Sequence, residues 1–348
     1  MTRCKIEALL RERERESKWL PHIYDDIIFV ENLLASWQEF LRGKKKRKDV
    51  AEFSMHFMDN VLNLHAELTE KTYRHGPYHP FKINDPKPRD IHKANVRDRL
   101  VHHAICRILY PYFDKQFIHD SYSCRIGKGT HRAMDRLRYF VRKASKNHTR
   151  TAWVLKCDIR KFFANIDHEI LKNILRWRIK DGDILWLLEQ VIDSFHVEGK
   201  ANIGLPLGNV TSQLLVNIYM NDLDQFLKRQ VKTRFYIRYS DDFVILHEDK
   251  RYLIGLIPII SEFLQTQLHL ELHPKKVSIE TLASGVDFLG WVHFPNHRIP
   301  RTATKNRMLK HLRKNKSPQT LASYLGSLSH GNTFELAQSI QAPKNQSV

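Results

Sequence analysis

The segment Tyr239-Ser240-Asp241-Asp242 places two adjacent carboxylates at a turn between two strand-like runs, residues 234–238 and 243–246. Neighbouring like charges repel each other, and each carboxylate resists removal from water. A bound divalent cation would remove this conflict, because Mg²⁺ is held by carboxylate oxygens and also binds phosphate oxygens. The motif therefore favours a metal-dependent site for phosphoryl transfer, although a plain polar hairpin turn would explain four residues equally well.

The charge balance indicates a polyanionic partner. The 348 residues include 57 Lys and Arg against 38 Asp and Glu, which gives a formal charge of +19 and a pI of about 9.7. A nucleic acid is the partner that such an excess favours. The four cysteines are dispersed without a CxxC pair, so the sequence predicts neither a disulfide framework nor a zinc knuckle.

The sequence predicts a soluble, cytoplasmic protein without membrane association. The N-terminus is highly charged and lacks the apolar region of a signal peptide. The most apolar run, residues 253–260, is too short to span a bilayer of about 30 Å.

The apolar pattern predicts an alternation of helices and strands. Helices are expected over residues 1–70, 96–109, 250–268 and the basic segment after Gly290. Further helices are expected after Asp167, which would cap the first of them, and along the apolar stripe at 215–226. A strand is expected at 153–159, a hairpin around 241–242, and loop with short strand in the proline-rich segment 75–90.

Asp158 ends the strand expected at 153–159. If that strand and the later hairpin share one sheet, three carboxylates converge and can hold two Mg²⁺ ions, for which Mn²⁺ can substitute. Such a pair of ions would activate a primer 3′-hydroxyl and stabilise the leaving pyrophosphate. Taken alone, Asp158 is also explained as a strand-end cap.

Seven segments occur in the order found in reverse transcriptases, and the chain resembles that family from about residue 60 to residue 335. They are residues 97–103, 123–131, 158–163, 207–213, 239–242, 270–276 and 287–291. Each segment is individually a weak signal, whereas the ordered set is specific. The resemblance implies an α+β, right-hand polymerase with fingers, an antiparallel palm sheet and a short helical thumb. The implied divisions are an N-terminal helical extension at 1–55, fingers at 56–150, palm at 151–292, and thumb with C-terminal tail at 293–348.

The resemblance also implies roles for individual residues. The implied catalytic residues are Asp158, Asp241, Asp242 and Lys276, with the Ile159 carbonyl as a further metal ligand. The implied nucleotide-binding residues are Lys87, Arg89, Ile159, Phe163, Leu207, Gly208 and Gln213. The implied nucleic-acid-binding residues are Arg125, Lys128, Tyr239, Leu289, Gly290, Arg301, Lys305 and Lys310.

Three of these roles have specific chemistry and a simpler alternative. Lys276 would protonate the leaving pyrophosphate, or it is a solvated lysine. Phe163 would clash with a 2′-hydroxyl and select dNTPs, whereas its apolar neighbours alone would make it a core residue. Lys87 and Arg89 would offset triphosphate charge, or they are surface charges in a proline-rich loop.

One departure from the common family pattern indicates a subtype. Most reverse transcriptases carry Gln-Gly-x-x-x-Ser-Pro where this chain has Leu207-Gly208-Asn209-Val210-Thr211-Ser212-Gln213. This form resembles the enzymes of diversity-generating retroelements, which copy a template-repeat RNA into cDNA with errors at template adenines. A leucine offers no hydrogen bond where a glutamine amide would hold the base pair in register. Drift at a packing position would also explain Leu207.

The resemblance implies partners as well. They are template RNA, the cDNA or primer strand, dNTPs and a small, basic, oligomeric accessory protein. Two other functions stay open: a group II intron-like or phage-defence reverse transcriptase without adenine mutagenesis, and a catalytically inactive RNA-binding scaffold. Retention of all three carboxylates and Lys276 argues against the scaffold.

Overall fold

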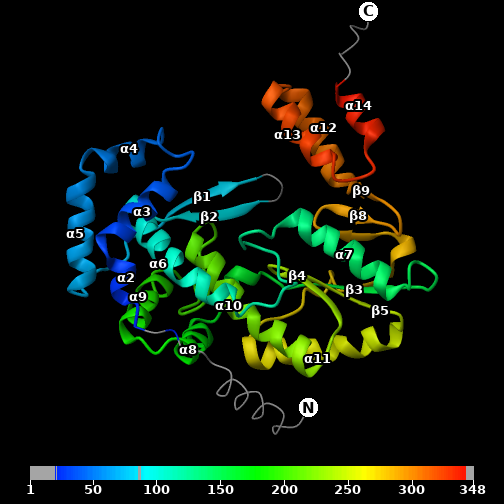
Figure 1. The fold of residues 1–348 in the computed structure, drawn as a ribbon, viewed down its shortest axis with the longest axis horizontal. Coiled ribbons are helices and arrows are strands. Elements are labelled where there is room, and N and C mark those ends of the chain that lie inside the picture. The colour runs from blue at the N-terminus through cyan, green and yellow to red at the C-terminus, as the bar shows by residue number, and fades with distance from the viewer. Residues whose placement is uncertain (1–19, 21, 85–87, 342–348) are drawn as a thin grey trace, which may run out of the picture. The chain divides into compact units, whose positions relative to one another are not determined.

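The computed structural model describes residues 20, 22–84 and 88–341, which form two compact units that interleave along the chain (Figure 1). The first unit comprises the described residues of Met1–Phe117 together with Lys161–Asp222 and Gln267–Leu270. The second comprises Ile118–Arg160, Leu223–Thr266 and the described residues after Glu271. The chain passes between the units several times, and the assignment of fingers, palm and thumb stays a prediction.

The first unit is mainly helical. Its elements are α2 (Tyr24–Ile28), α3 (Val30–Phe40), α4 (Lys48–Met55), α5 (Phe57–Thr69), the hairpin β1 (His79–Ile83) and β2 (Arg89–Lys93), α6 (Val96–Asp114), the 3₁₀ turn η1 (Phe162–Asn165), α8 (His168–Arg178), α9 (Gly182–Ile192) and most of α10 (Val210–Gln225). The helices predicted in the segments 22–70, 96–109 and 168–177 are confirmed.

Side-chain caps explain where several of these helices begin. The Asn95 side chain accepts a hydrogen bond from the Asp98 amide at the start of α6, and the predicted cap Asp167 accepts from two amides at the start of α8. Asp181 caps α9 in the same way, although the sequence analysis did not predict α9. Trp177, near the end of α8, is 37% exposed, because the helix turns this position toward solvent.

The second unit is built on a four-stranded antiparallel sheet with strand order β4-β5-β3-β6, which confirms the predicted α+β fold with an antiparallel sheet. The strands are β3 (Trp153–Asp158), β4 (Phe235–Tyr239), β5 (Asp242–His247) and β6 (Ser278–Thr281). Helix α7 (Thr130–Ala144) covers one face, where Leu137 and Phe140 pack with Val154 and Val244, and α11 (Lys250–Leu268) lies on the opposite side (Figure 1). The π-helical turn η2 (Phe226–Gln230) extends α10.

A second sheet follows in the same unit. It contains β7 (Val286–Phe288), β8 (Trp291–His293) and β9 (Arg298–Pro300), preceded by the 3₁₀ turn η3 (Leu282–Ser284). The prediction of helix directly after Gly290 was therefore wrong for residues 291–300. Burial at Trp291 and His293, with the intervening residue less buried, follows the period of two that is typical of a strand.

Three helices end the described chain: α12 (Thr302–Lys314), α13 (Pro318–Leu328) and α14 (Phe334–Gln341). Their own small core contains Met308, Leu312, Leu328 and Ile340. The loop between α13 and α14 returns to β9, where the Asn332 amide donates to the Arg298 carbonyl at 2.8 Å. A Cβ atom at Gly331 would lie 2.1 Å from the Trp291 ring, so only glycine permits this approach.

In the part of the chain that the structure describes, no helix combines the length and apolar character that crossing a bilayer requires.

Candidate active site

Asp158 and Asp242 lie at the same end of the four-stranded sheet. Asp158 is the last residue of β3, Asp242 is the first residue of β5, and the antiparallel register places their Cα atoms directly opposite. Directly opposed residues in such a pair have Cβ atoms about 4.5–5.5 Å apart. The structure thus brings together two of the three predicted carboxylates.

The third carboxylate, Asp241, belongs to the two-residue loop between β4 and β5. Tyr239 pairs with Asp242, which leaves Ser240 and Asp241 to make the turn. Ser240 has φ +59°, the left-handed region that type I′ and II′ hairpin turns require and that glycine usually fills. The backbone is therefore strained at the residue preceding the two carboxylates.

The three carboxylates repel one another. The pKa of Asp242 is raised to about 7, first by burial and then by the charges of Asp241 and Asp158, with only Lys156 opposing the shift by charge. A carboxyl group with such a pKa is in part protonated at neutral pH unless a cation joins it. This is the electrostatic conflict that the motif predicts.

Lys276 neutralises Asp158. Its Nζ donates to both carboxylate oxygens, at 2.9 and 2.8 Å, and the lysine side chain is 42% exposed, whereas the Asp158 side chain is only 10% exposed. The segment carrying Lys276 is fixed close to β3, because the His273 amide donates to the Asp158 carbonyl at 2.7 Å. Lys276 is therefore held at the predicted site, as the counter-ion of a predicted metal ligand.

The donor atoms suit Mg²⁺ in kind, because all are hard oxygens. The Ile159 carbonyl, directly after Asp158, stays a predicted further ligand. Among those residues, however, no three acidic, imidazole or thiol side chains are arranged as a metal site. Both Asp158 oxygens are bonded to Lys276, so Asp158 could bind a metal ion only after Lys276 moves away.

A buried ion pair directly beneath the turn was missed in the sequence analysis. Arg238 on β4 and Asp224 on α10 are both fully buried, and the guanidinium donates to both carboxylate oxygens, at 2.8 and 2.7 Å. The Tyr236 hydroxyl donates to Asp224 at 2.7 Å. The sequence alone carries no signal that joins these two residues, because the helix also contains Asp222 and the strand run also contains Arg234.

The predicted nucleotide-binding residues Phe163, Leu207, Gly208 and Gln213 lie in the first unit. The Leu207 carbonyl accepts from the His92 amide at 3.1 Å, which ties the loop before α10 to β2. Gly208 has φ +106°, and a Cβ atom there would lie 2.9 Å from Ile91, so the loop requires glycine. The Leu207 side chain is half-buried and Gln213 is exposed.

Phe163 is half-buried in η1, and its carbonyl accepts from the Leu205 amide at 2.8 Å. The segment after Asp158 and the loop carrying Leu207 therefore touch within one unit. Arg89 is exposed at the first position of β2, and Lys87 lies outside the described residues. The nucleotide-binding roles of these residues stay predictions.

Two predicted nucleic-acid contacts have partners within the protein. Arg125 donates to the carbonyls of Ile118 and Ser121, and Lys128 donates to the His119 carbonyl. Both cations thus stabilise the loop before α7. Tyr239 accepts a hydrogen bond from the Thr130 hydroxyl at 3.1 Å.

The other predicted nucleic-acid contacts lie around the β7–β8 hairpin and α12. Leu289 and Gly290 form the hairpin loop with φ +53° and +85°, so a leucine occupies a position that glycine usually fills. Arg301 bonds to Asp287 at 2.7 Å, whereas Lys305 and Lys310 are exposed on α12.

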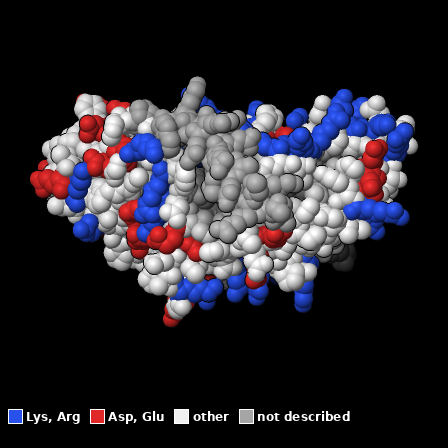
Figure 2. Space-filling view, turned by 90° about the horizontal axis from the view of Figure 1, so that it is seen from below, with Lys and Arg blue, Asp and Glu red and all other residues white. Residues whose placement is uncertain are grey.

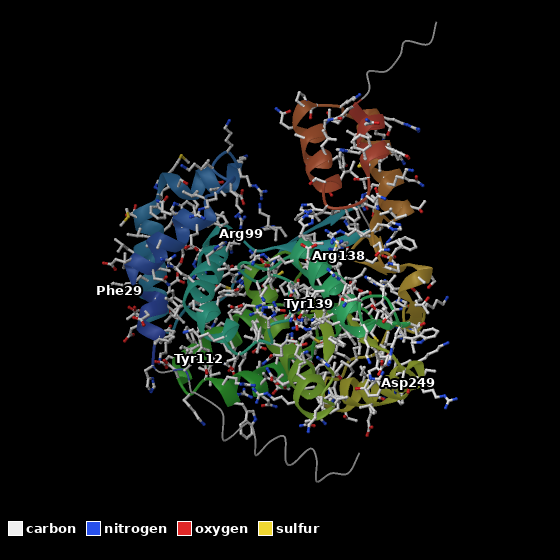
Figure 3. All side chains as sticks on the ribbon, turned by 45° about the vertical axis from the view of Figure 1, so that its right-hand side comes forward. Phe29, Arg99, Tyr112, Arg138, Tyr139 and Asp249 are labelled. Atoms are coloured by element: carbon white, nitrogen blue, oxygen red, sulfur yellow. The ribbon has the colours of Figure 1, made fainter. Side chains whose placement is uncertain are left out.

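Helix α7 presents a further basic and aromatic surface. Tyr139, 47% exposed, lies between the cationic groups of Arg136 and Lys143, which are 5.1 and 5.7 Å from its ring centre, and Arg138 projects from the same helix (Figure 3). Figure 2 shows Lys and Arg side chains gathered in several groups on one face of the molecule. Such surfaces suit contact with phosphates.

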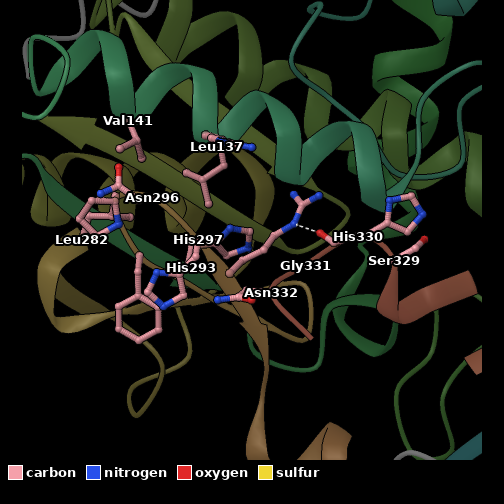
Figure 4. Close-up of a pocket in the computed structure, with 14 residues that line it drawn as sticks. Leu137, Val141, Leu282, His293, Asn296, His297, Ser329, His330, Gly331 and Asn332 are labelled. Atoms are coloured by element: carbon pink, nitrogen blue, oxygen red, sulfur yellow. Dashed lines mark hydrogen bonds between the residues drawn. The ribbon is translucent and has the colours of Figure 1, made fainter. Parts of the chain in front are cut away.

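The second unit also contains a pocket of about 520 Å³, and none of the three carboxylates lines it. It is bordered by α7, the β8–β9 turn and the α13–α14 loop, and none of the predicted site residues lines it (Figure 4). In it, Arg298 donates to the His330 carbonyl. We assign no step of the chemistry to this pocket, because its lining contains no carboxylate.

Comparisons with known proteins identify related chains. Residues 82–293 match the family described as reverse transcriptase (RNA-dependent DNA polymerase). The chain is similar to Protein YkfC of Escherichia coli (strain K12), with 26% identity over 280 residues, which are 70% of this chain and 71% of YkfC. It is also similar to the group II intron-encoded protein LtrA of Lactococcus lactis subsp. cremoris, with 24% identity over 266 residues.

The match to LtrA covers 73% of this chain and 40% of LtrA. A putative COX1/OXI3 intron 2 protein of Saccharomyces cerevisiae is 24% identical over 181 residues, 49% of this chain and 20% of that protein. The chain therefore spans less than half the length of these two intron-encoded relatives.

Proposed function

We propose that this chain, which belongs to the reverse transcriptase family, is the polymerase of a diversity-generating retroelement and copies a template-repeat RNA into cDNA with frequent errors at template adenines. Membership of the family rests on the match over residues 82–293, and it makes the chain an RNA-directed DNA polymerase. The subtype rests on Leu207.

The observation that supports the subtype is the setting of Leu207. Its backbone is fixed, because its carbonyl is bonded to β2 and the next residue must be glycine. Its side chain is half-buried and carries no donor or acceptor. A fixed backbone with an apolar side chain cannot hold a base pair in register by hydrogen bonding, and looser positioning reduces discrimination between right and wrong pairs.

We further propose that Asp158, Asp241, Asp242 and the Ile159 carbonyl hold Mg²⁺. Bound Mg²⁺ would lower the barrier to attack by the primer hydroxyl and offset charge on the triphosphate. Lys276 is bonded to Asp158 in the structure and would be displaced when Asp158 holds Mg²⁺. Its ammonium group would then lie beside the site and donate a proton to the leaving pyrophosphate. Arg89 and Lys87 would bind triphosphate oxygens, and Phe163 would exclude a 2′-hydroxyl.

Template RNA, the cDNA or primer strand and dNTPs are the substrates that this function requires. Phosphate contacts fall to the exposed cations Lys305 and Lys310 and to the surface of α7 around Tyr139. A small, basic, oligomeric accessory protein is part of the same proposal.

The test is to sequence cDNA made by the purified protein on an RNA that contains all four template bases. We expect misincorporation mainly at adenines, and we expect Leu207→Gln to lower the adenine error rate by about 10-fold, because an amide is restored. Leu207→Met is the matched control, since it keeps the volume and adds no amide donor. Equal error rates in all three proteins would show that Leu207 does not cause the errors at template adenines.

The alternative is a group II intron-like or phage-defence enzyme. It is favoured by the similarity to LtrA, which is named as a group II intron-encoded protein. It predicts accurate cDNA at adenines with the same polymerase activity. The error spectrum of the unmodified protein therefore separates the two functions without any variant.

A further inference from the structure

We propose that Arg238, supported by Asp224, is a positioning residue for the catalytic turn: its buried guanidinium holds the Ser240 carbonyl and thereby orients Asp241 and Asp242. The inference rests on the proposed polymerase function and adds a residue to its machinery. In this role Arg238 acts through the backbone of the turn, at the Ser240 carbonyl.

The first step is the contact itself. One guanidinium nitrogen of Arg238, Nη1, donates to the Ser240 carbonyl at 3.1 Å. Nε and Nη2 bond to Asp224, and Nη2 also bonds to the Ser121 hydroxyl at 3.1 Å. All three guanidinium nitrogens are therefore engaged, and the direction of the group is fixed on more than one side.

The second step is the geometry of the peptide unit. The carbonyl of Ser240 and the amide of Asp241 belong to one planar peptide group, so fixing the carbonyl direction also fixes the direction in which Asp241 leaves the turn. Ser240 has φ +59°, a conformation that is unfavourable for a residue other than glycine. The bond from Arg238 is formed in that conformation and offsets part of this cost.

The third step concerns why the charge is buried. A buried ion pair commonly contributes no more stability than a well-packed apolar pair of similar volume. Stability alone therefore does not explain a fully buried arginine in a strand whose neighbours, Tyr236 and Ile237, are buried. An apolar side chain could fill the same space, whereas it could not donate to the Ser240 carbonyl.

The fourth step is the anchoring of the strand around Arg238. The Arg238 amide donates to the Asp120 carbonyl at 3.0 Å, and the Arg238 carbonyl accepts from the Tyr122 amide at 2.9 Å. Both the backbone and the side chain of Arg238 are therefore held by hydrogen bonds to neighbouring segments. The guanidinium is a rigid support for the turn, because the residue that carries it has little freedom to move.

The experiment compares the double variant Arg238→Met/Asp224→Leu with the unmodified protein. Removing both charges avoids an unpaired buried ion, so we expect the variant to fold. We expect kcat for primer extension to fall about 10- to 100-fold because the carboxylates are misplaced, while KM for dNTP changes less than about 3-fold. A merely structural role would leave both constants unchanged in a folded variant.

A second readout needs no catalysis. Mn²⁺ binding is measured by electron paramagnetic resonance on the protein without substrate, and the concentration for half-saturation should rise about 10-fold in the double variant. A matched control replaces the ion pair Lys172–Asp193, which joins α8 to the chain after α9 at 2.7 Å, by Lys172→Met/Asp193→Leu. That control should leave both kcat and Mn²⁺ half-saturation unchanged.

The single variant Arg238→Lys tests the same positioning role if the double variant does not fold. Lysine keeps the charge against Asp224 but is a single nitrogen donor, which cannot reach Asp224 and Ser240 with the fixed fork of arginine. It should show the same loss of kcat and weaker Mn²⁺ binding. Unchanged kcat and Mn²⁺ half-saturation in either folded variant would overturn the positioning role, whereas failure of the unmodified protein to make cDNA would overturn the proposed function instead.

Discussion

Two sets of charge meet at the β4–β5 hairpin, one balanced and one unbalanced. Arg238 and Asp224 are fully buried, opposite in sign and bonded through two oxygens. Asp242 is buried beside the like charges of Asp241 and Asp158, which outweigh Lys156, and its pKa rises to about 7. The first set is paired within the protein, whereas we propose that Mg²⁺ completes the second.

The largest expected effect comes from removing the unbalanced set. Asp241→Ala with Asp242→Ala should reduce Mg²⁺-dependent primer extension on RNA by more than about 1,000-fold, because the proposed metal ligands are lost. The variant should unfold at a temperature no lower than the unmodified protein, since mutual repulsion is removed. Asp249→Ala, at an exposed aspartate just beyond β5 (Figure 3), is the control and should retain full activity. A large drop in melting temperature would show that Asp241 and Asp242 stabilise the fold and that their charges are not in conflict.

Breaking the balanced set should act on stability. Asp224→Asn keeps the shape of the side chain and leaves the Arg238 charge buried without its counter-ion, so the free energy of unfolding should fall by about 3–5 kcal/mol. Urea denaturation measures this change. A loss of less than about 1 kcal/mol in the free energy of unfolding would show that Arg238 does not depend on the Asp224 charge.

Lys276 is bonded to Asp158 of the unbalanced set, and its removal should have an intermediate effect. Lys276→Met should lower kcat about 100-fold if the lysine protonates pyrophosphate. It should also lower the Mn²⁺ concentration for half-saturation, because Asp158 no longer has to exchange a bonded ammonium. Lys275→Met, at the preceding exposed lysine, is the control. Weaker Mn²⁺ binding in Lys276→Met would show that the ammonium does not compete with the ion.

The smallest expected effect is a pH dependence of stability in metal-free protein. The pKa of Asp242 is about 7 in the folded state against 3.8 ordinarily, so the folded state binds the proton more tightly than the unfolded state. Stability from this group is therefore greatest near pH 4 and falls as the pH rises toward 7. Asp242→Asn should remove a decline of order 2 kcal/mol across that range, as followed by urea denaturation with EDTA present. An unchanged profile would contradict the raised pKa.

The sequence was informative where local pattern and chemistry coincide. The apolar run ending in Asp158 became β3, the run flanking Asp241-Asp242 became a hairpin, and Asp167 caps α8 as predicted. These features depend on neighbouring residues alone. Register was then the only step needed to place Asp158 opposite Asp242.

Other features depend on contacts between distant segments and could not be predicted. The Arg238–Asp224 pair joins a strand to a helix, and neither residue has a local signature. The short strands β8 and β9 have three residues each, too few for a period of two to be distinguished from a helical pattern. Lys276 was predicted at the site, whereas its bond to both oxygens of Asp158 depends on how the segment after α11 returns to β3.

The close approach of Gly331 to Trp291 has a mechanical consequence for the last three helices. They leave β9 through Arg301 and are bound back to β9 at Arg298, so they are attached at two separated points. A single hinge at residues 300–302 cannot swing them independently, because the second attachment would have to break. The last three helices and the β7–β9 sheet are therefore expected to move together as one body.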